Sequence, residues 1–458
     1  MAAIVTNKLK TQLLDTMFTE ITSASDRYYM AIGRSEVWDS AETVPTPTNS
    51  LRTIRNFKLS AQSIKSITDV SFVIPRYNWV SGTIYQAWDD NLSGTPSNAY
   101  YVLTEDNQVF VCLRQGKTAL GIAVASTEKP SSTVSKPVKM ADGYIWKFMY
   151  SIAGAVSAKF LSANFLPVQK ILDSANAPGL TAVDREQAEV QDATTKGQVL
   201  GLVITNAGNG YTSAPTVAIQ GNGFNAAGSA TVSGGKVVTL ELDSSTDSCM
   251  KMGFGYDFAS IDITGGGGAG AEGRVILIAD SGMGSNPISN LNSSSLMFNV
   301  KPAGTENGDF IVANQDFRQI AIMKQPRKYN DSDYTASSGR LVRYMQLTSV
   351  ADAEAFTRDV TITGATSGAK ALIDDIDSDR LYTHQNEDTK FVSFLEGETI
   401  TGGGQTGTLV SAGVDVDSDA FTNEDVERFK NDILYIENRA PVERTLTQTE
   451  DIKAVITL

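Results

Sequence analysis

His384 is the only histidine in the chain, and with the two cysteines it limits the acid–base and metal chemistry that the protein can perform. General-base catalysis near neutral pH most often uses histidine, so a Ser-His-Asp or Cys-His arrangement would have to include His384. This residue lies in the polar stretch RLYTHQNEDTK, and we expect an exposed loop histidine. Cys112 and Cys249 form neither a disulfide framework nor a zinc pattern, and we expect both to be reduced and structural. The sequence therefore predicts no transition-metal site and no catalytic histidine.

Two runs of aspartates could bind calcium. DDIDSD at residues 374–379 and DVDSD at residues 415–419 have the alternating acids of a calcium loop. In the second run, Ala420 stands where the loop's glycine belongs and Val426 where its bidentate glutamate belongs. We therefore interpret both runs as solvated turns, with calcium binding left open. Hydrolysis by a pair of carboxylates also stays open, because one sequence does not show which acids meet in space.

The run GGGGAG at residues 265–270 formally satisfies the dinucleotide-binding pattern G-x-G-x-x-G. It follows a Thr/Ile-rich strand and leads into EGRVILIA, which is also typical of a strand. A phosphate bound there would have no helix N-terminus to stabilise it. We therefore predict no nucleotide site and no cofactor.

The composition excludes further classes of protein. A length of 458 residues predicts about three domains. The chain has 38 Lys+Arg against 52 Asp+Glu and a formal charge of −14, so it lacks the positive surface that binds nucleic acid or anionic lipid. No apolar run reaches the roughly 18 to 20 residues of a membrane helix, and the first residues do not have the pattern of a signal peptide. We expect a protein that is made in the cytosol and not secreted.

The elements that must position these residues are mainly β-strands. Residues 4–21 predict an amphipathic helix, with apolar residues three or four positions apart at Leu9, Leu13, Met17, Phe18 and Ile21. Short runs rich in aromatic and β-branched residues follow, separated by Gly, Pro, Asn and Asp, and these predict strands. We expect short helices at residues 156–163 and 183–191. Near the C-terminus we expect a helix capped by Thr422 or Asn423, then two closing strands.

Two regions contain weak internal repeats. The first pair of copies is GYTSAPTVAIQG at residues 210–221 and GYDFASIDITG at 255–265, each followed by a Gly/Ala-rich turn. Alternating apolar residues and glycine turns predict small antiparallel sheets, which we interpret as two similar lobes packed together. A fainter pair, at residues 361–373 and 399–410, predicts a separate small β module.

Six sequence blocks, in this order, resemble one known family. They are AIGRSEVWDS (31–40), VIPRYNW (73–79), VFVCL (109–113), DGYIWKFMYSI (142–152), FRQIAIMKQP (317–326) and ILYIENRAPVERTLTQTEDIKAVITL (433–458). Together they look like the baseplate wedge protein of T-even-type contractile-tailed bacteriophages, the gene product eight family. The resemblance covers about residues 1–171, 296–347 and 422–458. Both repetitive regions lie outside it and look like insertions.

This resemblance implies a mainly β fold, with a multilayer β-sandwich core, helix-bearing loops and two small inserted β modules. It assigns residues 1–180, 295–348 and 420–458 to the core, and residues 197–280 and 355–415 to the insertions. It also implies a homodimer that contacts other wedge subunits and links them to peripheral proteins that carry tail fibres. The protein would then be located in the tail baseplate of the virion, and in the host cytoplasm during assembly. The family has no known enzymatic role, so the resemblance implies no catalytic, cofactor-binding or metal-binding residue.

The blocks that resemble this family contain the residues that we expect to build interfaces or to fix the scaffold. Aromatic side chains are enriched in such interfaces, and paired charges either lie on the surface or lose water when an interface forms. Our candidates are Trp38, Trp79, Trp146, Tyr144, Phe317, Arg318, Tyr435, Glu437 and Arg439.

A glycan-binding or glycan-hydrolysing tail protein is the main alternative, with tryptophans or the β lobes holding sugars and a carboxylate pair performing the chemistry. The repeat copies share Gly and Tyr but no acid, because Thr212 aligns with Asp257 and Ala218 with Asp262. A third interpretation, a calcium-stiffened adhesin module, rests on the two aspartate runs alone.

Overall fold

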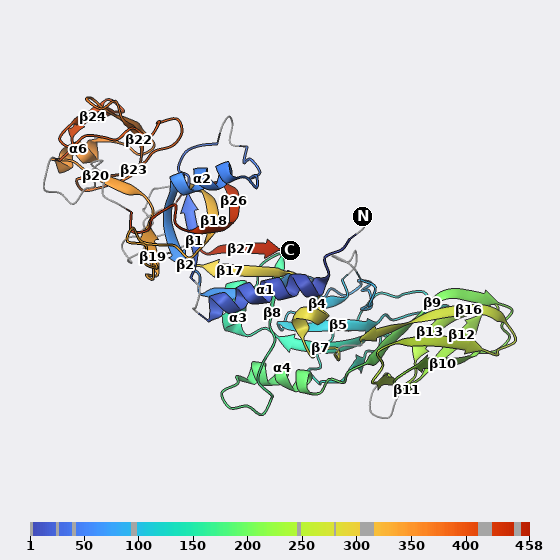
Figure 1. Cartoon of the computed structure of the whole chain (residues 1–458). Coiled ribbons are helices and arrows are strands. Elements are labelled where there is room, and N and C mark those ends of the chain that lie inside the picture. The colour runs from blue at the N-terminus through green and yellow to red at the C-terminus, as the bar shows by residue number, and fades with distance from the viewer. Residues whose placement is uncertain are drawn as a thin grey trace. The chain divides into compact units, whose positions relative to one another are not determined.

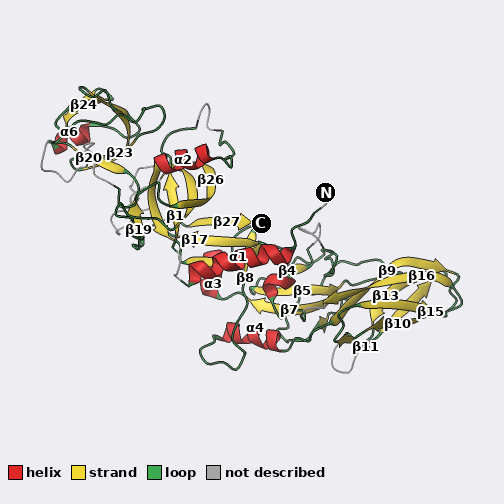
Figure 2. Cartoon of the chain, viewed as in Figure 1, coloured by secondary structure: helices red, strands yellow, loops and turns green. Residues whose placement is uncertain are grey.

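The computed structural model describes residues 3–23, 27–38, 43–92, 99–244, 249–278, 281–302, 316–410, 424–443 and 450–458. Strands predominate over helices (Figure 2), and the predicted mainly β, sandwich-type fold is confirmed. The chain forms two compact units. The first contains Met1–Gln12, Ser71–Ser295 and Leu458, and the second contains Leu13–Val70 and Leu296–Thr457. Residues 13–70 thus fold with the C-terminal part of the chain.

A four-stranded antiparallel sheet forms the centre of the first unit. Its strands, in spatial order, are β4 (Tyr101–Leu103), β5 (Gln108–Arg114), β7 (Ile145–Ser151) and β6 (Val138–Lys139). The interior residues of β5 and β7 are buried on both faces, as expected for near-continuous apolar runs. Helix α4 (Ala182–Asp192), whose N-cap Thr181 accepts a hydrogen bond from the Asp184 backbone, packs against β7. Nearby, β3 (Asp69–Pro75) pairs with β8 (Phe165–Val168), and α3 (Gly154–Phe160) precedes β8.

The first repetitive region extends from this unit as a lobe built only of strands (Figure 1). Long strands β9 (Gln198–Asn209) and β16 (Ala269–Ile278) pair with each other beside a four-stranded sheet. That sheet has the order β13 (Lys236–Leu242), β12 (Gly228–Ser233), β10 (Thr216–Gly221), β15 (Ala259–Thr264). A small ribbon pairs β11 (Phe224–Ala226) with β14 (Met252–Phe254). The GGGGAG run joins β15 to β16, so it precedes a strand and not a helix, as predicted.

The two copies of the repeat are neighbours in one sheet, which corrects our prediction of two packed lobes. Strand β10 of the first copy pairs antiparallel with β15 of the second, and Ala218 lies opposite Asp262. The tyrosine of each copy, Tyr211 or Tyr256, packs against a glycine that follows the other copy. A Cβ on Gly268, after the second copy, would lie 2.5 Å from the Tyr211 ring, and a Cβ on Gly223, after the first, would lie 2.3 Å from the Tyr256 ring. The Gly-Tyr pattern therefore has a packing role.

The second unit contains a five-stranded antiparallel sheet. Its strands, in spatial order, are β19 (Ser338–Arg340), β2 (Ala61–Ser66), β1 (Tyr28–Gly33), β18 (Asp316–Lys324) and β26 (Asp432–Glu443). Helix α2 (Leu51–Ser60), whose N-cap Ser50 accepts a hydrogen bond from the Thr53 backbone, contributes Phe57 to the core beneath β1. Strand β17 (Ser295–Val300) has β27 (Ile452–Thr457) as a neighbour in its sheet. The short helix α5 (Pro287–Asn290), which precedes β17, belongs to the first unit.

The second repetitive region forms a six-stranded sheet with its own core. The spatial order is β20 (Arg343–Gln346), β23 (Arg380–His384), β22 (Lys370–Asp377), β21 (Thr361–Gly364), β24 (Thr399–Gly402) and β25 (Gln405–Thr408). Helix α6 (Val350–Ala355) packs on it, and apolar side chains such as Phe356 and Phe394 fill the core. We call residues 343–410 the β module. It begins with β20, which lies inside the range 295–348 that the sequence assigned to the core.

Two helix predictions differ from the structure. The N-terminal helix α1 (Asn7–Thr22) forms as expected, but Leu14 and Ile21 are its buried residues, while Leu9 and Leu13 are 46% and 55% exposed. The C-terminal helix is wrong for its described part, because residues 424–431 form turns and an isolated bridge. The proposed caps Thr422 and Asn423 lie outside the described residues. Among the residues that the structure describes, no helix is both long and apolar enough to cross a membrane.

Candidate functional site

His384 is buried, so our prediction of an exposed loop histidine is wrong. It ends β23, and only 2% of its surface is exposed. The first aspartate run is also not a solvated turn throughout, because Asp374 and Asp375 lie in β22 and are each 1% exposed. The pairing of β22 with β23 shifts register between Ile373 and Asp375. This bulge interrupts the alternation of the strand, which allows two successive acids to be buried.

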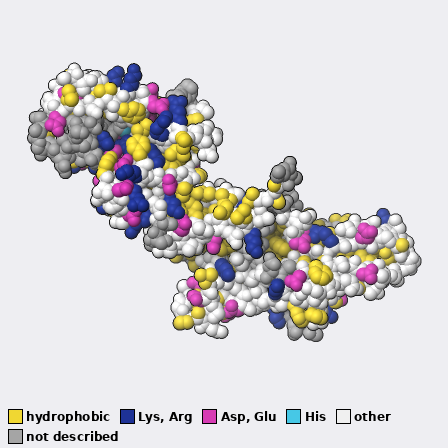
Figure 3. Space-filling view, in the orientation of Figure 1, with side chains coloured by type: hydrophobic (Ala, Val, Ile, Leu, Met, Phe, Trp, Pro, Cys, Tyr) yellow, Lys and Arg dark blue, Asp and Glu magenta, His cyan; other side chains and the backbone are white. Residues whose placement is uncertain are grey.

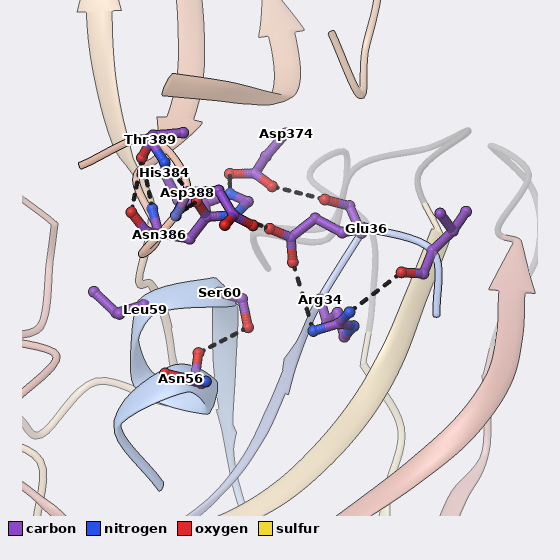
Figure 4. A network of polar contacts seen from close by, with 12 residues as sticks. Arg34, Glu36, Asn56, Leu59, Ser60, Asp374, His384, Asn386, Asp388 and Thr389 are labelled. Carbon is purple, nitrogen blue, oxygen red and sulfur yellow. Dashed lines mark hydrogen bonds and ion pairs between the residues drawn. The ribbon is translucent and has the colours of Figure 1, made fainter. Parts of the chain in front are cut away.

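The imidazole of His384 joins two carboxylates that come from distant parts of the second unit. Its Nδ1 lies 2.7 Å from Asp374 Oδ2, and its Nε2 lies 3.0 Å from Glu36 Oε1 (Figure 4). Asn386 Nδ2 donates to the same Glu36 oxygen at 2.7 Å, and Ser35 Oγ donates to Asp374 Oδ1 at 3.0 Å. We call these five residues the His384 clamp. The clamp fastens the segment that follows β1 to the β22–β23 hairpin of the β module.

Electrostatics determine the charge state of this clamp. Burial alone would lower the pKa of His384, but the charges and hydrogen bonds of Asp374 and Glu36 outweigh it and raise this pKa to about 10. Burial would raise the pKa of Glu36, but His384, Asn386 and Arg34 lower it to about 2. At neutral pH the clamp is therefore an imidazolium between carboxylates, and both ring nitrogens act as donors.

This geometry is unsuited to general-base catalysis. A catalytic histidine needs a free ring nitrogen that faces a nucleophile or substrate, but both nitrogens of His384 face carboxylates. Ser35 donates to Asp374 and makes no hydrogen bond to His384, so the three residues do not form a Ser-His-Asp relay. The arrangement stabilises structure instead.

The described acids do not form a metal centre. Among the described residues, no group of three or more His, Cys, Asp or Glu side chains could hold a metal ion. In the first aspartate run, Asp374 belongs to the clamp and Asp375 Oδ1 accepts a hydrogen bond from Arg358 Nε at 2.7 Å. The second run, residues 415–419, lies outside the described residues.

Four of the predicted residues lie in the segment that carries the clamp or in the strands β18 and β26. The Trp38 indole donates to the backbone carbonyl of Arg439 at 2.9 Å, and the Arg34 guanidinium lies 4.2 Å from the centre of its ring. Phe317 and Arg318, adjacent on β18, are buried, and Arg318 Nη1 donates to the backbone carbonyl of Ser35. Contacts from two strands therefore fix the segment that carries the clamp.

The charged residues of β26 form a surface pair. Arg439 Nε lies 3.5 Å from Glu437 Oε1, and both side chains are 36% exposed. Tyr435 donates to the other oxygen of Glu437 at 2.8 Å. A partly exposed pair of this kind contributes little to stability in the single chain.

The remaining aromatic candidates lie in or beside the core of the first unit. Tyr144 and Trp146 are fully buried, with stacked rings whose centres are 5.8 Å apart. Trp79 is partly buried and donates to Ser126 Oγ at 3.3 Å. Tyr144 and Trp146 therefore build the scaffold and are not available for contact with a partner while the unit is folded, whereas Trp79 keeps some exposed surface.

Sequence reasoning missed two exposed apolar surfaces. Phe224, Phe254 and Phe258 are exposed at the β11–β14 ribbon, where Figure 3 shows hydrophobic side chains gathered around β11, and the first two rings lie 6.1 Å apart. On α1, Leu9 and Leu13 are one helical turn apart and share an exposed face. The sequence could have indicated that the phenylalanines are exposed. They are flanked by Gly, Asn and Asp, which are typical of turns and not of core strands.

No protein-family model matches this chain, and no curated protein matches it either.

Proposed function

We propose that the protein is a structural subunit of a phage tail baseplate wedge. In this proposal a homodimer links the wedge core to peripheral, fibre-carrying proteins during virion assembly and tail contraction. One observation supports it most. Three of the six family-like blocks, at residues 31–40, 317–326 and 433–458, contribute the adjacent strands β1, β18 and β26 of one sheet. Segments far apart in the chain that resemble the family thus belong to one folded element.

Contacts between these blocks support the same proposal. Trp38 of the first block bonds to Arg439 of the last, and Arg318 of the fifth block bonds to Ser35 of the first. In the first unit, the blocks at 109–113 and 142–152 contribute the paired strands β5 and β7. These blocks therefore pack together as parts of the scaffold, which fits a protein whose function lies in its surfaces and not in a reactive centre.

The exposed apolar surfaces are where we expect partners to bind. Monomeric proteins rarely expose large contiguous apolar patches, and such patches commonly mark contacts with other proteins. The α1 face with Leu9 and Leu13 and the phenylalanines of the β11–β14 ribbon are two such places. A stable homodimer interface often buries about 2,000 Å² or more, so additional surface must contribute.

Light scattering tests this proposal directly. The mass of the purified chain would be measured alone, then in a mixture with the other wedge proteins of the same phage. We expect a dimer that enters a larger complex. A monomer whose mass does not change on mixing would overturn the wedge assignment.

The alternative of glycan binding is favoured by one specific arrangement. Phe258 lies next to Asp257, whose Oδ2 accepts a hydrogen bond from Asn222 Nδ2 at 2.9 Å, so an exposed ring, an acid and an amide lie together. Titration with host-surface oligosaccharides, comparing the wild type with Phe258→Ala, tests it. Saturable binding that the substitution abolishes would support the alternative, and the absence of saturable binding would remove it.

A further inference from the structure

Three exposed phenylalanines lie on the lobe that contains both copies of the first repeat. Phe224, Phe254 and Phe258 are 64%, 45% and 66% exposed, and Figure 3 shows hydrophobic side chains gathered around β11. The first two face each other across the β11–β14 ribbon, and the third follows β14 after a short turn. We call these three residues the phenylalanine patch. Exposed apolar groups of this kind commonly mark contacts with other proteins.

The repeat provides an internal comparison for this patch, because the same local structure occurs twice. When the copies are aligned on their tyrosines, the first two phenylalanines correspond to Ala269 and Asn209. These two residues pair in β16 and β9 as the phenylalanines pair in β11 and β14. Phe258 corresponds to Ser213, since each lies two residues after the tyrosine of its copy. All three counterparts are exposed, so the packing of the lobe does not explain why the patch is aromatic.

One cation and one anion lie beside the rings. Lys196 Nζ lies 3.7 Å from Asp257 Oδ1, and the two side chains are 65% and 60% exposed. The backbone carbonyl of Lys196 accepts a hydrogen bond from the Gly255 N–H at 2.9 Å, which fixes this residue next to the ribbon. Asn222 Oδ1 accepts hydrogen bonds from the backbone N–H groups of Asp257 and Phe258, which fixes the turn. A preformed surface with apolar rings and both charges is complementary to itself after a rotation of 180°, because each charge can then meet its opposite.

We propose that the phenylalanine patch binds the same patch of a second copy of the chain about a two-fold axis. The rings of the two copies pack together, and Lys196 of each copy pairs with Asp257 of the other. Three half-exposed rings supply roughly 300 Å² per copy, well below the roughly 800 Å² per partner of a standard interface. The contact is therefore weak alone and becomes strong where other contacts already hold two copies close together. It adds to the homodimer of the proposed function and does not depend on the wedge assignment.

Sedimentation velocity of the full chain over a series of concentrations tests this contact. The double variant Phe254→Asn, Phe258→Ser gives two places of the patch the residue types that the other copy has there. It should therefore melt as the wild type does, and we expect it to weaken self-association about tenfold. Asn209→Ala, at the corresponding exposed place of the other copy, is the control and should leave self-association unchanged.

Charge reversal identifies the occupant of the patch. Lys196→Glu alone and Asp257→Lys alone should each weaken self-association about threefold, because like charges then meet across the two-fold axis. An equimolar mixture of these two variants should associate at least as tightly as the wild type, because every charge then meets an opposite one on the other chain. Two results would overturn the proposal: a wild type that associates no further than the double phenylalanine variant, or a mixture that associates no better than its components. A glycan or a different protein as the occupant gives these negative results, whereas a chain that joins no wedge complex can still give the positive ones.

Discussion

The Nδ1 atom of His384 lies 2.7 Å from Oδ2 of Asp374, and both side chains are buried inside the second unit. The opposite nitrogen of the same ring meets Glu36, which is 348 positions earlier in the chain. One imidazolium thus connects the loop after β1 with the β module. Buried charges of this kind are costly to separate, because each one left alone has neither water nor a counter-ion.

Replacing the histidine should therefore loosen the β module. We expect His384→Ala to lower the free energy of unfolding by about 3 to 5 kcal/mol, because Asp374 would stay buried without its cation. Native-state hydrogen exchange of β22 and β23 measures this loss in the second unit alone. Asp388→Ala, four residues away and exposed, is the control and should have little effect. Equal losses in both variants would show that the clamp contributes nothing specific.

The clamp also predicts how stability depends on pH. The pKa of His384 is raised from 6.5 to about 10, so its stabilisation is complete below about pH 6.5 and is lost as the pH rises through 10. The pKa of Glu36 is lowered from 4.5 to about 2, so its contribution is present above pH 4.5 and is lost as the pH falls through 2. The difference in stability between the wild type and His384→Ala should shrink steadily from pH 6.5 to pH 10. A difference that stays constant over this range would contradict the charged clamp.

The packing of Tyr211 and Tyr256 against glycines predicts how substitutions change the stability of the lobe. Gly268→Ala and Gly223→Ala would each place a Cβ within 2.5 Å of a buried tyrosine ring. We expect each to lower the melting temperature, at a cost of about 1 to 3 kcal/mol in overpacking. Gly154→Ala is the matched control: nothing lies within 4 Å of its Cβ, and in α3 the added methyl group should be neutral or slightly stabilising. If all three variants melted together, the packing role of the Gly-Tyr pattern would be wrong.

The strands and the helix at residues 183–191 could be predicted because their signals are local. Alternation and β-branched residues define a strand wherever it pairs, and the predicted helix agrees with α4, which begins after the N-cap Thr181. Alternation does not say which strand pairs with which. The two repeat copies therefore looked like separate lobes. In the structure Thr216, which begins β10, lies opposite Thr264, which ends β15, so the copies form one antiparallel pair.

The clamp could not be predicted for a different reason. The polar stretch around His384 resembles a loop, because polar residues in a strand are usually exposed. Its burial depends on Glu36 and Ser35, which arrive from the other end of the chain, and on a bulge in β22. Neither the long-range contact nor the bulge leaves a periodic pattern near residue 384.

Helix α1 provides the last test, because its exposed and buried leucines are adjacent in sequence. Leu13 is 55% exposed, whereas Leu14 is 2% exposed. We expect the double variant Leu9→Gln, Leu13→Gln to melt at the wild-type temperature, because neither side chain contributes much to the core, and to form less dimer or wedge complex in light scattering. Leu14→Gln should instead lower the melting temperature, because it buries an amide in an apolar site. If the double variant assembled as well as the wild type, the exposed face of α1 would not be an interface, and the partner contacts would have to lie elsewhere on the scaffold.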